Sequence, residues 1–543
     1  VQLHVIIHSE EDLAKLDQEQ TAGVLTYEEV EEQHERSLEE EEEEDWEEDF
    51  YCYRTVAETY DSMEDLTDQY PGLISLDTIG QSYLKQQNEE EGYDIKILIL
   101  GANASTVTEK VDMMIVGGQH SRELPPPESL MRWVEHLLGN FGIDPDITWI
   151  LNRTNIHIIP IANPDGRQIV QDNLAWNYRK NAHPNDCDDG PEGYGVDLNR
   201  NYPMFYGDDE GSSPDYCSIN YRGTEPLSEP EASAVYHYAR ALFANDIKKG
   251  TSEDAEDRRE EACPTNATGM FIDVHSNGDY IYFPWGYEDE PSPNHLPLLT
   301  MAAKLAKPGD YELWGPGQDG FQYFVSGSAQ DSIYGMECVF TQGYELGSKQ
   351  YARCEEMEDS IVPIVFESLL YAAKCASAPY ILPRGPDILS IEVNSTEPKN
   401  VTFVVEVSDE ALIVEHAKFD DEDDRSQPID IVLVFVDTHP YDSAGEGSLM
   451  APQDGAFDDV DEVATVSLDL SMFEGVHVLY FQASDQAGFS GPASAVWIDL
   501  PKASSETTVG GGSEEFELPG PGESSSQVEL TVTVGRGGHE ESK

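Results

Sequence analysis

Helical and β-rich patterns alternate between residues 50 and 379. The pattern begins with Val56, Tyr60, Met63 and Leu66, apolar or aromatic residues at helical spacing. Later apolar runs predict strands at residues 95–100, 111–116, 155–161, 270–274 and 338–344. Between them, helical periods predict helices at residues 128–138, 229–243, 298–306 and 357–376. Ser228 and Glu231 form a capping-box pattern that predicts the start of the second of these helices. The alternation favours an α/β layer fold with a largely parallel core sheet.

The pattern changes after the prolines between residues 379 and 386, beyond which no good helical period occurs. Short β-branched runs separated by turn residues follow at 401–407, 431–436, 464–470, 476–483 and 494–499. Runs of this kind predict a small all-β sandwich, of immunoglobulin or fibronectin type, over residues 385–501. We therefore expect two folded domains, an α/β domain over residues 50–379 and this sandwich.

The two ends of the chain have a different composition from these domains. Residues 1–49 end in an acidic block with seven consecutive acids at 39–45. Like charges at this density repel one another, which predicts a solvated, flexible segment, with the remnant of a pro-segment as the alternative. Residues 502–543 are rich in Ser, Gly and Glu, which predicts a disordered tail.

Charge excludes two classes of partner. The 543 residues include 31 Lys and Arg against 107 Asp and Glu, a formal net charge of −76. Such a chain lacks the basic surface that binds nucleic acid or an anionic membrane. Its 39% hydrophobic content is too high for a wholly disordered chain, and no run is long and apolar enough for a membrane span. We interpret the excess charge as a solubility or salt-adaptation trait.

Cysteines and glycosylation sequons indicate the compartment. Five sequons begin at Asn103, Asn152, Asn266, Asn394 and Asn400, and the chain has seven cysteines. An odd number leaves at least one thiol without a partner in the chain. We expect a secreted, extracellular protein whose signal peptide is not visible because the chain starts at Val1.

Candidate metal ligands follow two of the predicted strands. His120 and Glu123 lie just after the strand at 111–116, and His275 lies just after the strand at 270–274. Strands of a parallel sheet end at a common carboxyl edge, where α/β folds bind ligands. A short spacer between two ligands and a long one to the third is typical of a catalytic zinc site with an open position for water. Taken alone, His120 would more often be an ordinary loop histidine. The chain has no CxxC pair, which argues against a structural zinc.

These residues belong to an ordered set of motifs. The set comprises His120-Ser-Arg-Glu123, Asn163-Pro-Asp-Gly166, Tyr178-Arg-Lys-Asn181, Gly195-Val-Asp-Leu-Asn-Arg-Asn201, Ser228-Glu-Pro-Glu231, Asp273-Val-His-Ser276, Tyr323 and Tyr344-Glu-Leu-Gly347. Each motif is weak alone, but their order is specific. From about residue 51 to 378 the chain resembles the zinc carboxypeptidases of the funnelin type, the family of carboxypeptidases A, B and T. The resemblance implies a mixed, largely parallel twisted sheet with helices on both faces.

The resemblance also implies catalytic roles. His120, Glu123 and His275 would hold one Zn²⁺, which would activate water and polarise the scissile carbonyl. Asp197 would orient a ligand histidine. The position of Glu345 in its motif implies that it is the general base. The position of Arg179 in its motif implies that it stabilises the oxyanion.

Further residues would bind substrate. Asn199 and Arg200 would hold the terminal carboxylate of a peptide or protein, because a planar guanidinium suits that bidentate contact. Arg122 would line a neighbouring subsite, and Tyr323 would close over the bound end. Gln330 falls at the floor of the side-chain pocket, although a one-residue gap would move that position to Ala329.

Other features are specific to this chain. Cys187 and Cys217 flank the segment of Asn199 and Arg200, as a disulfide pair does in some relatives, so we expect that bridge to tie down the loop. Asn277 and Ser332 stand where the family often has aromatic residues. Five acids at residues 420–424 predict a solvated loop, with a calcium site as the alternative.

Together, the motifs and the family resemblance predict a metallocarboxypeptidase that hydrolyses the C-terminal peptide bond of peptides or proteins. One alternative is a related zinc amidase or deacylase that acts on other carboxylated amides. The other is a non-catalytic, cation-binding surface protein, against which the retained Glu345 and the three metal ligands argue. The sandwich shows no ligand signature, so its partner stays open.

Overall fold

The computed structural model describes residues 50–103, 110–173, 177–187, 193–208, 211–244, 260–316, 323–397, 399–410, 426–442, 447–500 and 531–534. The acidic segment 1–49 and the acids at 420–424 lie outside the described residues. Within the predicted tail, the described residues form the short strand β17 (Thr531–Val534), which pairs with β16 (Ser494–Leu500). The chain divides into two units, residues 1–52 and 53–543, and the second holds all the elements described below.

A mixed eight-stranded sheet forms the centre of the first domain, in the order β1-β2-β4-β3-β5-β8-β6-β7. Its strands are β1 (Ile74–Gln81), β2 (Asp94–Leu100), β3 (Val111–Gly117), β4 (Thr154–Ile159), β5 (Met270–His275), β6 (Tyr280–Tyr282), β7 (Glu312–Trp314) and β8 (Phe340–Glu345). The four inner strands β4, β3, β5 and β8 run parallel, while β1, β2 and β6 each have an antiparallel neighbour. The predicted fold class is confirmed.

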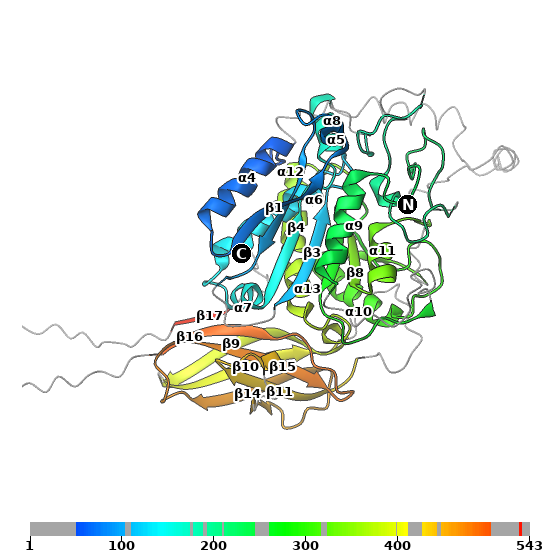
Figure 1. The fold of residues 1–543 in the computed structure, drawn as a ribbon. Helices are drawn as coiled ribbons and strands as arrows, with labels where there is room; N and C mark the ends of the chain where they lie inside the picture. The colour runs from blue at the N-terminus through cyan, green and yellow to red at the C-terminus, as the bar shows by residue number, and fades with distance from the viewer. Residues whose placement is uncertain are drawn as a thin grey trace, which may run out of the picture. The chain divides into compact units, whose positions relative to one another are not determined.

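Helices lie in front of and behind this sheet (Figure 1). They are α4 (Val56–Gln69), α5 (Tyr83–Gln87), α6 (Pro125–Asn140), α7 (Pro145–Arg153), α8 (Pro164–Asn173), α9 (Pro230–Leu242), α10 (His295–Ala306), α11 (Ala329–Glu337), α12 (Cys354–Glu356) and α13 (Val362–Cys375). Short 3-10 turns lie at Leu198–Arg200, Lys307–Gly309, Leu382–Arg384 and Pro440–Asp442, and a π-turn lies at Met357–Ile361. None of the described helices is both long enough and apolar enough to cross a membrane.

Several boundaries differ from the sequence-based prediction. The capping-box prediction for α9 is wrong, because Glu229 and not Ser228 is the N-cap. The Ser228 hydroxyl instead donates to the Glu229 carboxylate at 2.8 Å. Pro363 lies in the first turn of α13, where a missing N–H is tolerated. Strand β8 begins at Phe340, because Cys338 ends helix α11 in the left-handed conformation. The sequence patterns did not predict helix α7, although Asp144 is its N-cap and Pro145 is its first residue.

The second domain consists of two antiparallel sheets, as predicted for a sandwich. One has the order β13-β14-β10-β9 and the other β12-β11-β15-β16-β17. Their strands are β9 (Asp387–Glu397), β10 (Asn400–Ser408), β11 (Ile429–Val436), β12 (Ser448–Leu449), β13 (Ala451–Pro452), β14 (Asp461–Asp469), β15 (Gly475–Asp485), β16 and β17. The apolar side chains of the two sheets meet in one core that includes Val401, Phe403, Val434, Phe481 and Ile498.

Disulfides join distant segments of the first domain. Cys187 pairs with Cys217, the bridge that the family resemblance implies, and Cys263 pairs with Cys338. Among the described cysteines, Cys375 is the free thiol, and it is buried.

Candidate active site

Strand register brings the predicted site together at the carboxyl edge of the sheet. His275 and Glu345 are register partners at the ends of the parallel strands β5 and β8. On the other side of β5, Gly117 ends β3 opposite Val274. The chain then turns at Gly118, whose φ of +63° is a glycine conformation. That turn carries His120 and Glu123 back over the end of β5.

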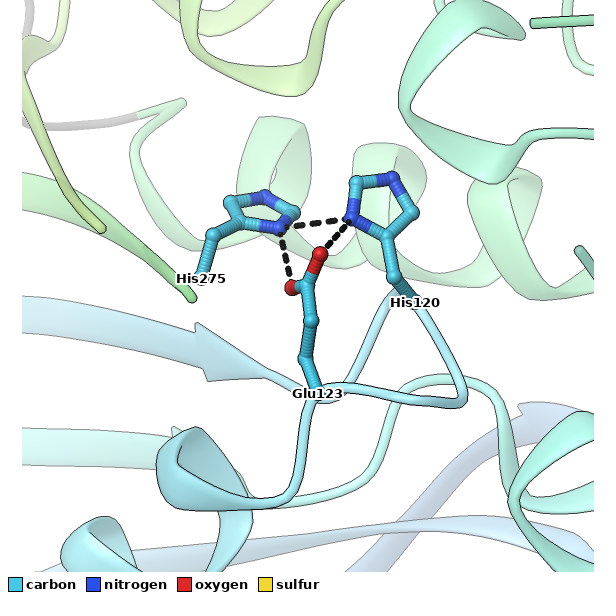
Figure 2. Close-up of side chains that lie close together, drawn as sticks. All are labelled: His120, Glu123 and His275. Atoms are coloured by element: carbon cyan, nitrogen blue, oxygen red, sulfur yellow. Dashed lines mark hydrogen bonds and ion pairs between the residues drawn. The ribbon is translucent and has the colours of Figure 1, made fainter. Parts of the chain in front are cut away.

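The three candidate metal ligands converge on one point (Figure 2). His120 Nδ1 lies 2.7 Å from Glu123 Oε1, and His275 Nδ1 lies 2.9 Å from Glu123 Oε2. The two Nδ1 atoms are 2.9 Å apart, and one ligand atom from each residue falls within 4.8 Å of the others. All three side chains are buried. Two imidazoles and a carboxylate form a donor set that suits zinc and leaves a fourth position for water.

Carboxylates hold the far nitrogens of both histidines. Asp197 Oδ1 lies 3.0 Å from His120 Nε2, and Asp273 Oδ2 lies 3.0 Å from His275 Nε2. When each Nε2 donates its proton to a carboxylate, each Nδ1 carries the lone pair that a metal needs. Asp197 was predicted for this position, whereas Asp273 was not. Its signal was the i, i+2 spacing from His275, which places both side chains on one face of a strand.

Asp197 also organises the neighbouring arginine. Arg179 Nε donates to Asp197 Oδ2 at 3.0 Å, and Arg179 Nη1 lies 3.6 Å from Glu123 Oε1. Burial favours the neutral form of Asp197, but the charges of Arg179 and Arg200 outweigh it and hold the pKa of this carboxyl well below its usual range. Asp197 therefore stays ionised and fixes the guanidinium of Arg179 beside the metal ligands.

The predicted carboxylate-binding pair is buried. Arg200 donates from Nε to Gly211 O at 2.8 Å and from Nη1 to Asn199 O at 2.7 Å. The Asn199 side chain donates to Asp273 Oδ2 at 3.2 Å and accepts from Ala329 N at 2.8 Å. Asn199 therefore has protein partners on both sides of its amide, while Arg200 retains guanidinium N–H groups for a ligand.

One cavity unites most of the predicted residues. Those that line it are His120, Arg179, Asn199, Arg200, Tyr323, Gln330 and Glu345. The ring of Tyr323 is half exposed and packs against Trp314, with ring centroids 4.8 Å apart. Gln330 lines the cavity, whereas its neighbour Ala329 does not. Arg122 is half buried and does not line this cavity.

The two residues that depart from the family pattern, Asn277 and Ser332, lie outside the cavity lining. Ser332 is fully buried, and its hydroxyl accepts from Met204 N at 3.0 Å. Asn277 donates to Ser348 O at 2.7 Å. Neither residue lines the cavity, so we assign neither an effect on its shape.

Glu345 is the acid that faces the cavity from the end of β8. Burial, and then the negative charge of Glu123, raise its pKa to about 8. Such a carboxyl holds a proton more tightly than an ordinary glutamate. A cation held by Glu123 would offset part of the repulsion between the two acids. Geometry and electrostatics therefore suit Glu345 for moving a proton close to neutral pH.

Comparison with known proteins agrees with this geometry. Residues 59–364, more than half of the chain, match the family model described as zinc carboxypeptidase. The chain belongs to the zinc carboxypeptidase family. It is a metallocarboxypeptidase, a hydrolase, by membership of that family, and the cluster of His120, Glu123 and His275 can hold the metal that the family name implies.

Individual relatives of this zinc carboxypeptidase are distant. Carboxypeptidase B2 of Bos taurus is 27% identical over 333 residues, which cover 60% of this chain and 70% of the relative. Mast cell carboxypeptidase A of Homo sapiens is 28% identical over 317 residues, which cover 56% and 66%. The crystal structure of thrombin activatable fibrinolysis inhibitor superposes with a TM-score of 0.50 at 24% identity over 60% of this chain and 74% of that one. That likeness supports the fold alone.

Proposed function

We propose that this metallocarboxypeptidase binds one Zn²⁺ and removes the C-terminal residue of peptides or proteins, with Glu345 as general base. One observation carries the proposal: a single cavity contains a metal ligand, an acid at the sheet edge and two arginines, namely His120, Glu345, Arg179 and Arg200. A peptide end carries the matching groups, a scissile carbonyl and a free carboxylate.

His120, Glu123 and His275 would hold the metal, which when bound would make water a stronger acid and polarise the scissile carbonyl. Glu345 accepts the proton of the attacking water and returns it to the leaving amine, so that water is added across the C–N bond. Arg179, held by Asp197 at 3.0 Å, is placed to stabilise negative charge on the carbonyl oxygen.

Arg200 orients the substrate by pairing with its terminal carboxylate. Its backbone partners, Gly211 O and Asn199 O, fix the guanidinium plane inside the cavity. Tyr323, half exposed at the same cavity, would cover the bound end. We assign Arg122 to the neighbouring subsite and Asn199 to a supporting contact with the terminal carboxylate.

A related zinc amidase would share the metal ligands and Glu345. Arg200 favours the carboxypeptidase, because a buried guanidinium inside the cavity suits a substrate with a free carboxylate. We also propose that the enzyme is secreted, which fits its disulfides, among them Cys187–Cys217 and Cys263–Cys338.

One experiment tests this function. A set of peptides with free or amidated C-termini is incubated with the protein, with and without a chelator, and the released residues are identified by mass spectrometry. We expect release only from free termini, lost with the chelator and restored by added zinc. Equal cleavage of amidated peptides would contradict the role of Arg200, and unchanged cleavage in chelator would contradict the metal mechanism.

A further inference from the structure

The lining of the cavity includes a buried amide whose oxygen has no protein partner. Gln330 lies in the first turn of α11, is 2% exposed and lines the cavity. Its Oε1 atom is buried and forms no hydrogen bond. Buried polar atoms are almost always paired, so an orphan inside a ligand cavity indicates a group that the ligand completes.

The acid next to Gln330 is already engaged. Asp331 is 1% exposed, and its two carboxylate oxygens lie 3.0 and 3.2 Å from Gly286 N, which donates to them. Hydrogen bonds from the Tyr287 backbone and the Ser328 side chain also reach this carboxyl. Burial raises its pKa to about 7, which reduces its negative charge near neutral pH. Asp331 is therefore committed to the protein and is a poor counter-ion for a basic side chain.

Several other lining groups are uncharged. Tyr282, Trp285 and Val325 supply apolar surface, and Ser328 uses its hydroxyl to cap α11, accepting from Asp331 N at 3.2 Å. The cationic lining residues, Arg179 and Arg200, are bound to Asp197 and to backbone oxygens at the carboxylate-binding end of the cavity. Neither arginine is therefore left to pair with an acidic side chain.

We propose that Gln330 selects substrates whose C-terminal residue carries a side-chain amide, glutamine or asparagine. The inference rests on the proposed carboxypeptidase function and names its preferred substrate class. An amide offers both a donor and an acceptor, so it pairs with the Gln330 amide in either orientation of that group. Apolar side chains can contact the apolar lining but leave Gln330 unpaired, and charged ones find no free counter-charge in the lining.

The test compares peptides of one sequence that end in Gln, Met, Glu, Asn, Leu or Lys. Gln and Met have similar size, as do Asn and Leu, so each pair isolates the amide. We expect kcat/KM for the Gln and Asn peptides to exceed that for Met and Leu by at least about tenfold, the scale of one hydrogen bond to a buried group. A flat profile, a preference for Met or Leu, or a preference for Lys or Glu would each overturn the inference.

Variants connect the preference to Gln330. Gln330→Met replaces the amide with an apolar side chain of similar size and should make the Met peptide the better substrate. Gln86→Met, on the exposed surface of α5, controls for the substitution itself and should leave the profile unchanged. Retained Gln preference in Gln330→Met overturns the assignment. Because that variant should gain activity on Met peptides, a folding defect cannot imitate the expected result. Hydrolysis of none of the peptides would instead contradict the proposed function.

Discussion

His275 Nε2 lies 3.0 Å from Asp273 Oδ2, the carboxylate two residues earlier on the same strand. Asp273 is fully buried, and Gln119 Nε2 donates to its two oxygens at 2.7 and 2.9 Å. The Tyr202 hydroxyl in turn donates to Gln119 Oε1 at 2.8 Å. This chain of hydrogen bonds fixes the imidazole of His275 with Nδ1 turned toward the other metal ligands.

Replacing Asp273 with Asn should weaken zinc binding by about 10- to 100-fold, because an amide orients the imidazole less firmly and removes its negative partner. Zinc affinity is measured by titration against a metal buffer. Asp112→Asn is the matched control, since Asp112 faces His157 Nε2 at 3.3 Å and is not among the metal-binding cluster. Equal losses in both variants would contradict the role assigned to Asp273.

Replacing Glu345 with Gln should leave zinc bound and lower kcat by about 10²- to 10⁴-fold, because the amide accepts no proton from water. Zinc content is measured by elemental analysis alongside the rate on a peptide with a free C-terminus. Glu367→Gln on α13, half buried and outside the cavity, is the control. A Glu345→Gln enzyme with normal kcat would show that another group is the base.

Asp146 connects the two domains. Its carboxylate lies 2.6 Å from Lys374 Nζ and accepts hydrogen bonds from Ala495 N and Trp149 Nε1, both at 2.9 Å. Asp146→Ala should lower the free energy of unfolding by about 3 kcal/mol, because the largely buried Lys374 ammonium loses its carboxylate partner and keeps only its hydrogen bond to Ser494 Oγ at 3.0 Å. Lys374→Met in the same background should recover part of this loss. Denaturant unfolding measures both variants, and a double variant less stable than Asp146→Ala would contradict the account.

Glu231 should make the protein less stable as pH rises. It is fully buried, and burial raises its pKa to about 8. The folded state then keeps a proton that the unfolded state releases above the ordinary glutamate pKa, so stability falls between about pH 4.5 and 8. Glu231→Gln should flatten the dependence of the melting temperature on pH in that window. Glu392→Gln, an exposed control on β9, should follow the wild type; identical pH profiles for all three proteins would contradict the prediction.

The net charge of −76 should slow capture of acidic peptides at low salt. Long-range repulsion opposes their approach, and added salt screens it, so kcat/KM on acidic peptides should rise with ionic strength. Neutral peptides of the same length serve as the control. The same salt series applied to thermal stability tests salt adaptation, and a flat response would rule that interpretation out.

Local patterns were sufficient for much of the fold. The apolar runs that became β3 and β5 were predicted because buried parallel strands are rich in apolar residues along most of their length. Strand β1 was missed, because it is polar at several positions and half exposed at the sheet edge. The start of α9 was misplaced, because Ser228 bonds to Glu229 instead of capping the helix.

The sequence by itself indicated an α/β layer fold followed by β-rich runs, and it identified the candidate ligands His120, Glu123 and His275. Periodicity and motif spacing are local properties, so they can be read along the chain. Tertiary structure decided that Gln119 bonds to Asp273, that Asp146 pairs with Lys374 and that the Gln330 amide oxygen has no partner. Each depends on strand register and on packing between segments far apart in sequence, which no local pattern specifies.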